Sequence, residues 1–355
     1  MFDLSPDTIN KNIKKNLIMS GMLKIFVLCI ITFNAIAYDQ AKLMHAWVSI
    51  VMIRGYTESG SLAYGSGVIV GENQVITNCH VLRKTKQPWV SQGDTAYSIM
   101  GVQANRWQDL CLLTIFQLNK NPVPIGRSND LTKGQELAAM GHSSGSPAPL
   151  TTGGYMISAY DMDGGKIILS SAKFRLGASG SGLFDMKGNL VGINTFKTTG
   201  YGSYYSMPAE WIHKLKELPM EKEFPIQGKA LWEEDEESKP FFLKIAIPKV
   251  KKDWATLVKI TKDWTEKEVN NTEAWYEYGH ANEMLDLSDK AINYYKKALA
   301  IDPMNSDALF RMGMVENKLG HPVEAKKILT SLNKLNPARA DELDEVINCK
   351  NKCKK

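Results

Sequence analysis

The sequence predicts a chain of two parts, an all-β barrel or sandwich followed by an α-helical repeat array. Short apolar runs separated by Gly, Asn, Asp and Pro fill residues 38–218, a pattern typical of an all-β domain with tight turns. Beyond residue 251 the apolar spacing becomes helical, and a 34-residue repeat is visible. A chain of 355 residues is long enough for both parts.

An export signal is predicted over residues 1–37. Lys24 precedes the apolar run "IFVLCIITFNAIA", which ends in small residues before Tyr38. This order of basic flank, apolar stretch and small-residue cleavage site is typical of a secretory signal peptide. Thr32 and Asn34 interrupt the run, which is short for a bilayer span. We therefore expect cleavage and export with no stable membrane span afterwards, and an uncleaved anchor is the alternative.

The composition excludes several classes of partner and cofactor. The net charge of +5 is mild and no basic stripe occurs, which argues against nucleic-acid binding. No C-x-x-C pair or histidine cluster is present, so no metal site is predicted, and no nucleotide or organic cofactor motif is visible. An even number of cysteines remains after cleavage, which permits disulfides in an exported chain. These are Cys79, Cys111, Cys349 and Cys353.

Residues 219–250 differ from both flanks and predict a linker. The segment holds four prolines and the acidic run Glu233 to Glu237, a composition typical of an irregular connection. The helical part then occupies 251–355, with repeats at about 271–304 and 305–338. Its recurring pairs are Ala274 and Ala308, Gly279 and Gly313, Ala291 and Ala325, and Pro303 and Pro337.

The recurring residues are those that a helical hairpin needs. Small side chains let two helices approach closely, and the proline ends the second helix. The period and the small positions resemble the tetratricopeptide repeat (TPR). A further helix is expected around Trp254 and Trp264, and a capping helix over 339–353.

A glycine-flanked pair of serines occurs in "GASGSG", residues 177–182. Glycine serves where the backbone must take a positive φ or approach another group closely. The stretch is therefore either a polar turn or the loop of a nucleophile whose backbone N–H groups stay exposed. The choice depends on whether the chain also supplies a base and an orienting acid.

Both partners are available upstream. His80 follows the apolar run of "QVITNCH", and Asp109 opens the strand-like run "DLCLLTIF". Burying a carboxylate at a strand end is costly unless it has a partner. An imidazole N–H is such a partner, and the pairing fixes the tautomer whose other ring nitrogen can accept a serine proton.

Four stretches in order resemble the motifs of trypsin-like serine peptidases, most closely the bacterial periplasmic HtrA-type branch. They are "GSGVIV…VITNCHV", "DLCLLTI", "AAMGHSSG" and "GASGSGLFDMKGNLVGINT", and the resemblance spans about residues 60–212. It implies a chymotrypsin-like double β-barrel, so the predicted fold class is multidomain β + α with a TPR hairpin array. It also implies a serine endopeptidase, placed by the export signal in the bacterial periplasm or secreted.

The resemblance assigns roles residue by residue. His80 would be the base, Asp109 the orienting acid and Ser179 the nucleophile. The backbone N–H groups of Gly177 and Ser179 would form the oxyanion hole. Ser181 falls where the family has glycine, so we expect it to be a small turn residue. The backbone of Thr195, Phe196 and Lys197 would pair with the substrate peptide.

Two positions depart from the family pattern. Ala178 stands where trypsin has an aspartate that pairs with a newly cut N-terminus, so we expect activation to need only signal removal. Gly182 replaces a frequent proline and removes no catalytic group. Residues 172–176 and 202–206 would line the specificity pocket, and they include no acidic side chain. This disfavours a preference for Lys or Arg and leaves the substrate preference open.

The cysteines near the proposed base and acid favour a disulfide. Cys79 directly precedes His80, and Cys111 lies two residues after Asp109. A hydrogen bond between base and acid would force the two cysteines close together, and two buried thiols are the alternative. The last two cysteines of the chain are four residues apart on a predicted helix, near the geometric limit for a bridge, so their pairing stays open.

The expected partners are protein or peptide substrates. The TPR part would offer a small groove to a protein partner or serve only to pack on the protease. The alternative function is a catalytically silent protease fold that acts as a TPR binding module. A lost triad residue would favour that alternative, and the sequence retains all three.

Overall fold

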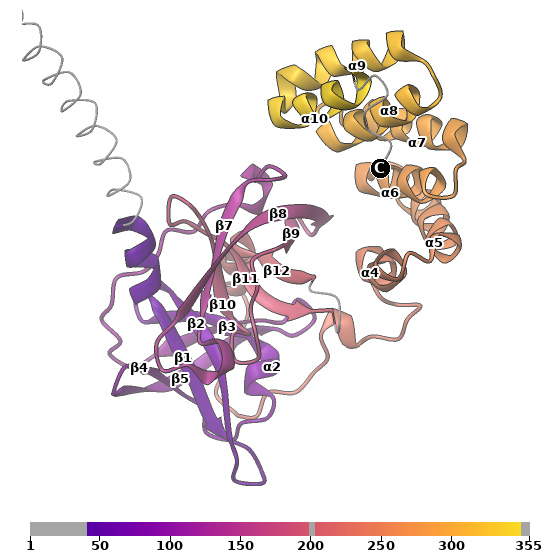
Figure 1. The fold of residues 1–355 in the computed structure, drawn as a ribbon. Coiled ribbons are helices and arrows are strands. Elements are labelled where there is room, and N and C mark those ends of the chain that lie inside the picture. The colour runs from indigo at the N-terminus through magenta and orange to yellow at the C-terminus, as the bar shows by residue number, and fades with distance from the viewer. Residues whose placement is uncertain (1–40, 199–202, 349–355) are drawn as a thin grey trace, which may run out of the picture. The chain divides into compact units, whose positions relative to one another are not determined.

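The computed structural model describes residues 41–198 and 203–348 (Figure 1). The predicted export signal, Cys349 and Cys353 lie outside these residues. The chain divides into two compact units. The first comprises the chain up to Ala159 with Gly165–Phe196 and Tyr204–Gly228, and the second comprises Tyr160–Gly164, Lys197–Ser203 and the chain from Lys229 onward. No helix within 41–198 and 203–348 is long and apolar enough to cross a membrane.

The first β-barrel is built from the short apolar runs of the N-terminal half. Its strands are β1 (Ile50–Tyr56), β2 (Leu62–Gly71), β3 (Gln74–Asn78), β4 (Trp89–Gln92), β5 (Thr95–Asn105) and β6 (Leu110–Ile115). The antiparallel order is β5-β4-β1-β2-β3-β6, and a further pairing of β5 with β6 closes the barrel. Buried side chains such as Val51, Ile69 and Leu113 fill its core, as expected for strands rich in β-branched residues.

A second closed barrel follows. Its strands are β7 (Glu136–Gly141), β8 (Leu150–Met162), β9 (Gly165–Ser170), β10 (Ser181–Asp185), β11 (Leu190–Lys197) and β12 (Tyr204–Pro208). They close in the order β10-β11-β12-β9-β8-β7 around a core that includes Leu137, Ile168 and Leu183. The predicted double barrel is therefore confirmed.

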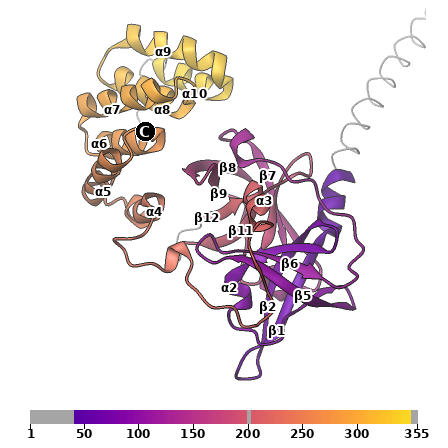
Figure 2. The same cartoon turned by 180° about the vertical axis from the view of Figure 1, so that it is seen from behind.

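The second unit is an array of antiparallel helices, seen from behind in Figure 2. They are α4 (Phe241–Lys251), α5 (Trp254–Lys267), α6 (Thr272–Glu283), α7 (Ser288–Ile301), α8 (Ser306–Lys318), α9 (Pro322–Leu335) and α10 (Pro337–Asn348). Asn271 and Asn305 cap α6 and α8 in the same way, each accepting a bond from the N–H three residues on. A Cβ on Gly279 would lie 2.7 Å from the ring of Tyr295, so only glycine lets these helices pack. The predicted helical array is confirmed.

The segment 219–250, predicted to be a linker, contains a short strand and a helix. Strand β13 (Met220–Glu221) pairs with β5 at the edge of the first barrel, opposite Gln103 and Val102. Helix α4 occupies the end of the segment and buries Phe242, Ile245 and Ala246. The prolines suggested a break in structure, but Pro240 is the N-cap of α4 and Pro248 lies in its last turn. The acidic run remains between these two elements.

Candidate active site

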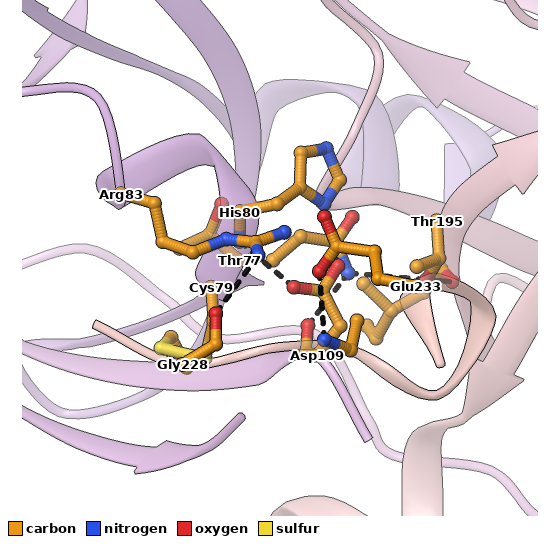
Figure 3. A network of polar contacts seen from close by, with 12 residues as sticks. Thr77, Cys79, His80, Arg83, Asp109, Thr195, Gly228 and Glu233 are labelled. Atoms are coloured by element: carbon orange, nitrogen blue, oxygen red, sulfur yellow. Dashed lines mark hydrogen bonds and ion pairs between the residues drawn. A yellow bond between two sulfur atoms is a disulfide. The ribbon is translucent and has the colours of Figure 1, made fainter. Parts of the chain in front are cut away.

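Strand pairing brings His80 and Asp109 together. His80 lies in the short helix α2 (Cys79–Leu82), which begins where β3 ends. Strand β3 pairs with β6 so that Asn78 lies opposite Leu110. Asp109, the residue before β6, is therefore placed next to His80. Figure 3 shows the two side chains together, with Arg83 on one side and Thr195 on the other.

The carboxylate of Asp109 holds His80 at two points. Its Oδ2 lies 2.5 Å from Nδ1 of the imidazole, and its Oδ1 accepts the backbone N–H of His80 at 2.8 Å. When Asp109 is ionised, Nδ1 must carry the shared proton, which leaves Nε2 as the acceptor nitrogen. Asp109 is fully buried. Burial raises its pKa above the ordinary value, although the charges of His80 and Arg83 and the bonds from His80 act in the opposite direction.

Buried polar groups connect this pair to the second barrel. Asn78 donates from Nδ2 to the backbone carbonyl of Asp109 at 2.9 Å and to Oγ1 of Thr195 at 3.1 Å. Thr195 belongs to β11, so one amide spans both barrels. To one side of the pair, Arg83 donates to the carbonyl of Gly228 at 2.9 Å (Figure 3). The bond from Asn78 thus holds the backbone of Asp109 in place.

A disulfide joins Cys79 and Cys111. The register that places Thr77 opposite Cys111 brings the two cysteines to adjacent strand ends. Both are buried, and their Cα atoms are 5.0 Å apart. The bridge therefore connects the residue before His80 to the strand that begins after Asp109.

Ser179 lies on a loop that packs against the strand end leading to His80. A Cβ on Gly180 would lie 2.3 Å from Oγ1 of Thr77 and 2.9 Å from the backbone nitrogen of Asn78. Only glycine permits this approach, and its φ of +83° is one that other residues rarely adopt. Ser179 is partly exposed, and its Oγ forms no hydrogen bond with another residue of the described chain. The loop thus brings Ser179 to the end of the barrels that carries His80.

The backbone N–H groups of this loop fall into two sets. Those of Ala178, Gly180 and Ser181 donate to the carbonyls of Arg175, Asn194 and Ala178. Within residues 41–198 and 203–348, no acceptor is found for the N–H groups of Gly177 and Ser179. Gly177 has a φ of +94°, and a Cβ there would lie 2.7 Å from the carbonyl oxygen of His142. The loop therefore presents two unpaired donors that are two residues apart.

Ser181 has a different environment from Ser179. It is fully buried at the start of β10, and its Oγ accepts a bond from Asn194 at 2.9 Å. His142, another histidine near the loop, is also buried, and its Nδ1 pairs with the carbonyl of Ser146 at 2.8 Å. Desolvation lowers the pKa of His142. Neither side chain is placed as a nucleophile or base.

The predicted substrate strand lies at the end of β11. Strand β10 begins at Ser181, opposite Asn194, so residues 195–197 extend past its start. Thr195 is buried, the ring of Phe196 stacks on Tyr205 with centroids 4.8 Å apart, and Lys197 is exposed. The predicted pocket segment contributes Phe174, which packs edge-on against Tyr204 at 5.1 Å.

Sequence reasoning missed two buried polar residues of the site. One is Ser66, whose hydroxyl donates to the carbonyl of Gly177 at 2.8 Å, and the other is Asn78, which donates to Asp109 and Thr195. Ser66 and Asn78 both lie within the family motifs, but nothing marked them individually. The available signal is that each is a polar residue inside an apolar strand run, where burial demands a partner.

No cluster of His, Cys, Asp or Glu suited to a metal ion occurs in the part of the chain that the structure describes.

Comparisons with known proteins agree with this architecture. Residues 65–193 match the trypsin-like peptidase domain, and residues 288–343 match the tetratricopeptide repeat. The chain is thus similar to a trypsin-like peptidase domain in one segment and to TPR repeats in another, and HtrA-type proteases are among the proteins that it resembles.

Individual relatives match about half of this chain. Serine protease HTRA1 of Xenopus tropicalis is 30% identical over 197 residues, which is 51% of this chain and 42% of that protein. Anti-sigma-I factor RsgI9 of Acetivibrio thermocellus is 31% identical over 169 residues, 46% of this chain and 24% of that protein. The chain therefore spans less than half the length of these relatives. Among solved structures, the HtrA-type protease AlgW with tripeptide aligns with a TM-score of 0.45 and 25% identity, covering 50% of this chain and 62% of that one.

Proposed function

We propose that this protein is an exported serine endopeptidase that cleaves peptide bonds through an acyl-enzyme. The observation that carries the proposal is the buried Asp109 carboxylate bonded to Nδ1 of His80, beside the loop of Ser179. A serine hydroxyl is a poor nucleophile while it keeps its proton, so it needs a neighbouring general base to take that proton. A histidine oriented by a carboxylate can serve as that base. The match to the trypsin-like peptidase domain supports the same conclusion.

In the proposed reaction, Oγ of Ser179 attacks the carbonyl carbon of the scissile peptide bond while Nε2 of His80 takes its proton. The same proton passes to the leaving amine as the C–N bond breaks, which leaves an ester on Ser179. Water then attacks the ester with His80 again as base, and the hydroxyl of Ser179 is restored. Asp109 stays ionised throughout and stabilises the imidazolium.

The two unpaired N–H groups of the loop suit an oxyanion hole. Donors already aimed at the position of the developing oxyanion stabilise it without reorganisation during the reaction. We assign this role to Gly177 and Ser179, since their N–H groups have no acceptor among the described residues.

Peptide binding is proposed for residues 195–197. They run past the start of β10 and so offer backbone to an incoming strand, with main-chain bonds supplying affinity. The TPR array is proposed to bind a protein substrate or partner in the groove that stacked helical hairpins form. The N-terminal signal pattern and the disulfide together support the bacterial periplasm or secretion, because disulfides persist in such compartments.

A serine-directed fluorophosphonate probe tests the proposal on the full chain. The wild-type protein is expected to react with the probe and to cleave casein, and Ser179→Ala is expected to lose both activities. Ser181→Ala is the matched control, because Ser181 lies two residues after Ser179. This variant is expected to keep most of the labelling and most of the cleavage.

Two outcomes would contradict the proposal. Loss of labelling in Ser181→Ala with retention in Ser179→Ala would show that the nucleophile is assigned wrongly. A folded wild-type protein that neither reacts nor cleaves would favour the silent protease fold, with the TPR array as its working part.

A further inference from the structure

The backbone carbonyl groups around Ser179 are held by hydrogen bonds. Four consecutive carbonyls, from Leu176 to Ser179, each accept a bond. Their donors are the N–H of Ser144 for Leu176 (2.6 Å), the hydroxyl of Ser66 for Gly177 (2.8 Å), the N–H of Ser181 for Ala178 (2.9 Å) and the N–H of Ser66 for Ser179 (2.8 Å). In a trans peptide the carbonyl of one residue and the N–H of the next lie in one plane and point in opposite directions. The bonds to Leu176 and Ala178 therefore direct the N–H groups of Gly177 and Ser179, and the bond to Gly177 holds the peptide plane between them.

Ser66 supplies two of these four donors from a different barrel. It lies in β2 and is fully buried. Its hydroxyl accepts the N–H of His142 at 2.9 Å while donating to Gly177, and its carbonyl accepts the hydroxyl of Thr77 at 2.7 Å. One residue thus connects β2, the segment after β7, the strand end before His80 and the Ser179 loop.

The hydroxyl of Ser66 acts where the loop has the most rotational freedom. Gly177 takes a φ of +94°, and glycine lacks the Cβ that limits rotation in other residues. Without the hydroxyl, the carbonyl of Gly177 and the N–H of His142 would both lose their partner in a buried environment. The peptide plane between Gly177 and Ala178 joins the two planes that carry the N–H groups of Gly177 and Ser179, so its rotation would change the angle between those two N–H groups.

We infer that Ser66 is a positioning residue for the oxyanion hole, acting through the carbonyl of Gly177 and not by contact with substrate. This inference rests on the proposed peptidase function. Ser66, a strand residue of the first barrel, would thus align two N–H donors that belong to the second barrel.

The test compares Ser66→Ala with wild type on a peptide substrate and on a peptide boronic acid. The boronate adduct with Ser179 places an oxygen in the oxyanion hole. Loss of one such donor costs roughly 10²- to 10³-fold in kcat, so a misaligned pair is expected to cost about tenfold or more. KM should stay near the wild-type value, and boronate affinity should fall in parallel with kcat.

Ser128→Ala is the matched control. Ser128 is also fully buried, and its hydroxyl likewise accepts a backbone N–H, that of Lys166 at 2.7 Å, and donates to an oxygen, that of Glu210 at 2.6 Å. Its removal should affect folding stability as Ser66→Ala does and leave kcat and boronate affinity unchanged.

The outcomes separate the inference from the function on which it rests. An active wild type whose kcat and boronate affinity are the same in Ser66→Ala overturns the inference alone. A wild type that neither cleaves peptides nor binds the boronate overturns the proposed function and the inference with it. Should Ser66→Ala fail to fold, the isosteric pair Ser66→Thr and Ser66→Val decides. A higher kcat for Thr supports the role of the hydroxyl, and equal values overturn it.

Discussion

At the residue scale, the most costly group in the site is the Asp109 carboxylate. It is fully buried, and desolvation outweighs the charge of His80 in its net effect, so the pKa is raised. A buried carboxylate costs free energy of folding, and its hydrogen bonds can offset this cost by holding other groups in a defined position. Here those bonds hold both the ring and the backbone of His80.

Asp109→Asn is expected to lower activity and to change how stability depends on pH. Activity should fall by about 10⁴ in kcat, because an amide favours the wrong imidazole tautomer. The folded pKa of Asp109 lies above its unfolded value, so the unfolded chain ionises first as pH rises. As the pH rises from the ordinary carboxyl pKa through the raised pKa of folded Asp109, the free energy of unfolding of wild type should therefore fall relative to that of the variant.

Urea unfolding of both proteins across this pH range measures the difference. If wild type instead gains stability relative to the variant as pH rises, the bonds from His80 outweigh burial and the folded protein lowers the pKa of Asp109.

Much of the proposed site was predictable, because each of its main residues lies in a short sequence pattern that can be recognised by itself. A base after one strand, an acid before another and a serine among glycines each stand out locally. Ser66 could not be found in this way, because its partners Gly177 and His142 lie far along the chain. Only closure of both barrels brings them together.

At the element scale, the disulfide connects the helix that carries His80 to the strand that begins directly after Asp109. It joins α2 to β6 across a sequence separation of 32 residues. Strand pairing between β3 and β6 already aligns the two elements, so the bridge reinforces an existing register.

Replacing both Cys79 and Cys111 by alanine is expected to lower the free energy of unfolding by about 3.7 kcal/mol, the chain-entropy value for a loop of this size. Activity should fall as well, because the helix bearing His80 loses its anchor to the strand after Asp109. Denaturant unfolding and peptide hydrolysis measure the two effects. A non-reduced digest of exported wild type should contain the bridged peptide, and finding both residues as alkylatable thiols would contradict the expectation.

Elements that depend on local pattern were predicted well, and those that depend on distant partners were not. The small residues and the prolines of the TPR hairpins recur at one period, which made those helices visible in the sequence. Strand β13 is only two residues long and owes its form to β5. Helix α4 was hidden by prolines that it tolerates at its two ends.

At the scale of the whole molecule, the two units have separate cores. The barrels bury their own apolar strands, and the helices bury another cluster that includes Tyr295, Leu309 and Leu343. Separate cores are the feature that lets a domain fold alone.

A chain ending at Lys239 is expected to keep the double barrel. Circular dichroism should show β structure with a cooperative thermal transition, and small chromogenic peptides should still be cleaved. Discrimination among protein substrates should weaken, since the proposed TPR groove is gone. An insoluble product would show that the barrels need the helices in order to fold.

The division of the proposed triad between two barrels also sets the order of events during synthesis. His80 and Asp109 belong to the barrel that leaves the ribosome first, and Ser179 enters only with the second. A partly made chain therefore holds a base and an acid with nothing for them to activate. The nucleophile loop finds its donors on β2 only after the second barrel closes. The proposed peptidase activity would thus appear in one step, only after the second barrel has folded. An unfinished chain would therefore be unable to cleave other unfinished chains.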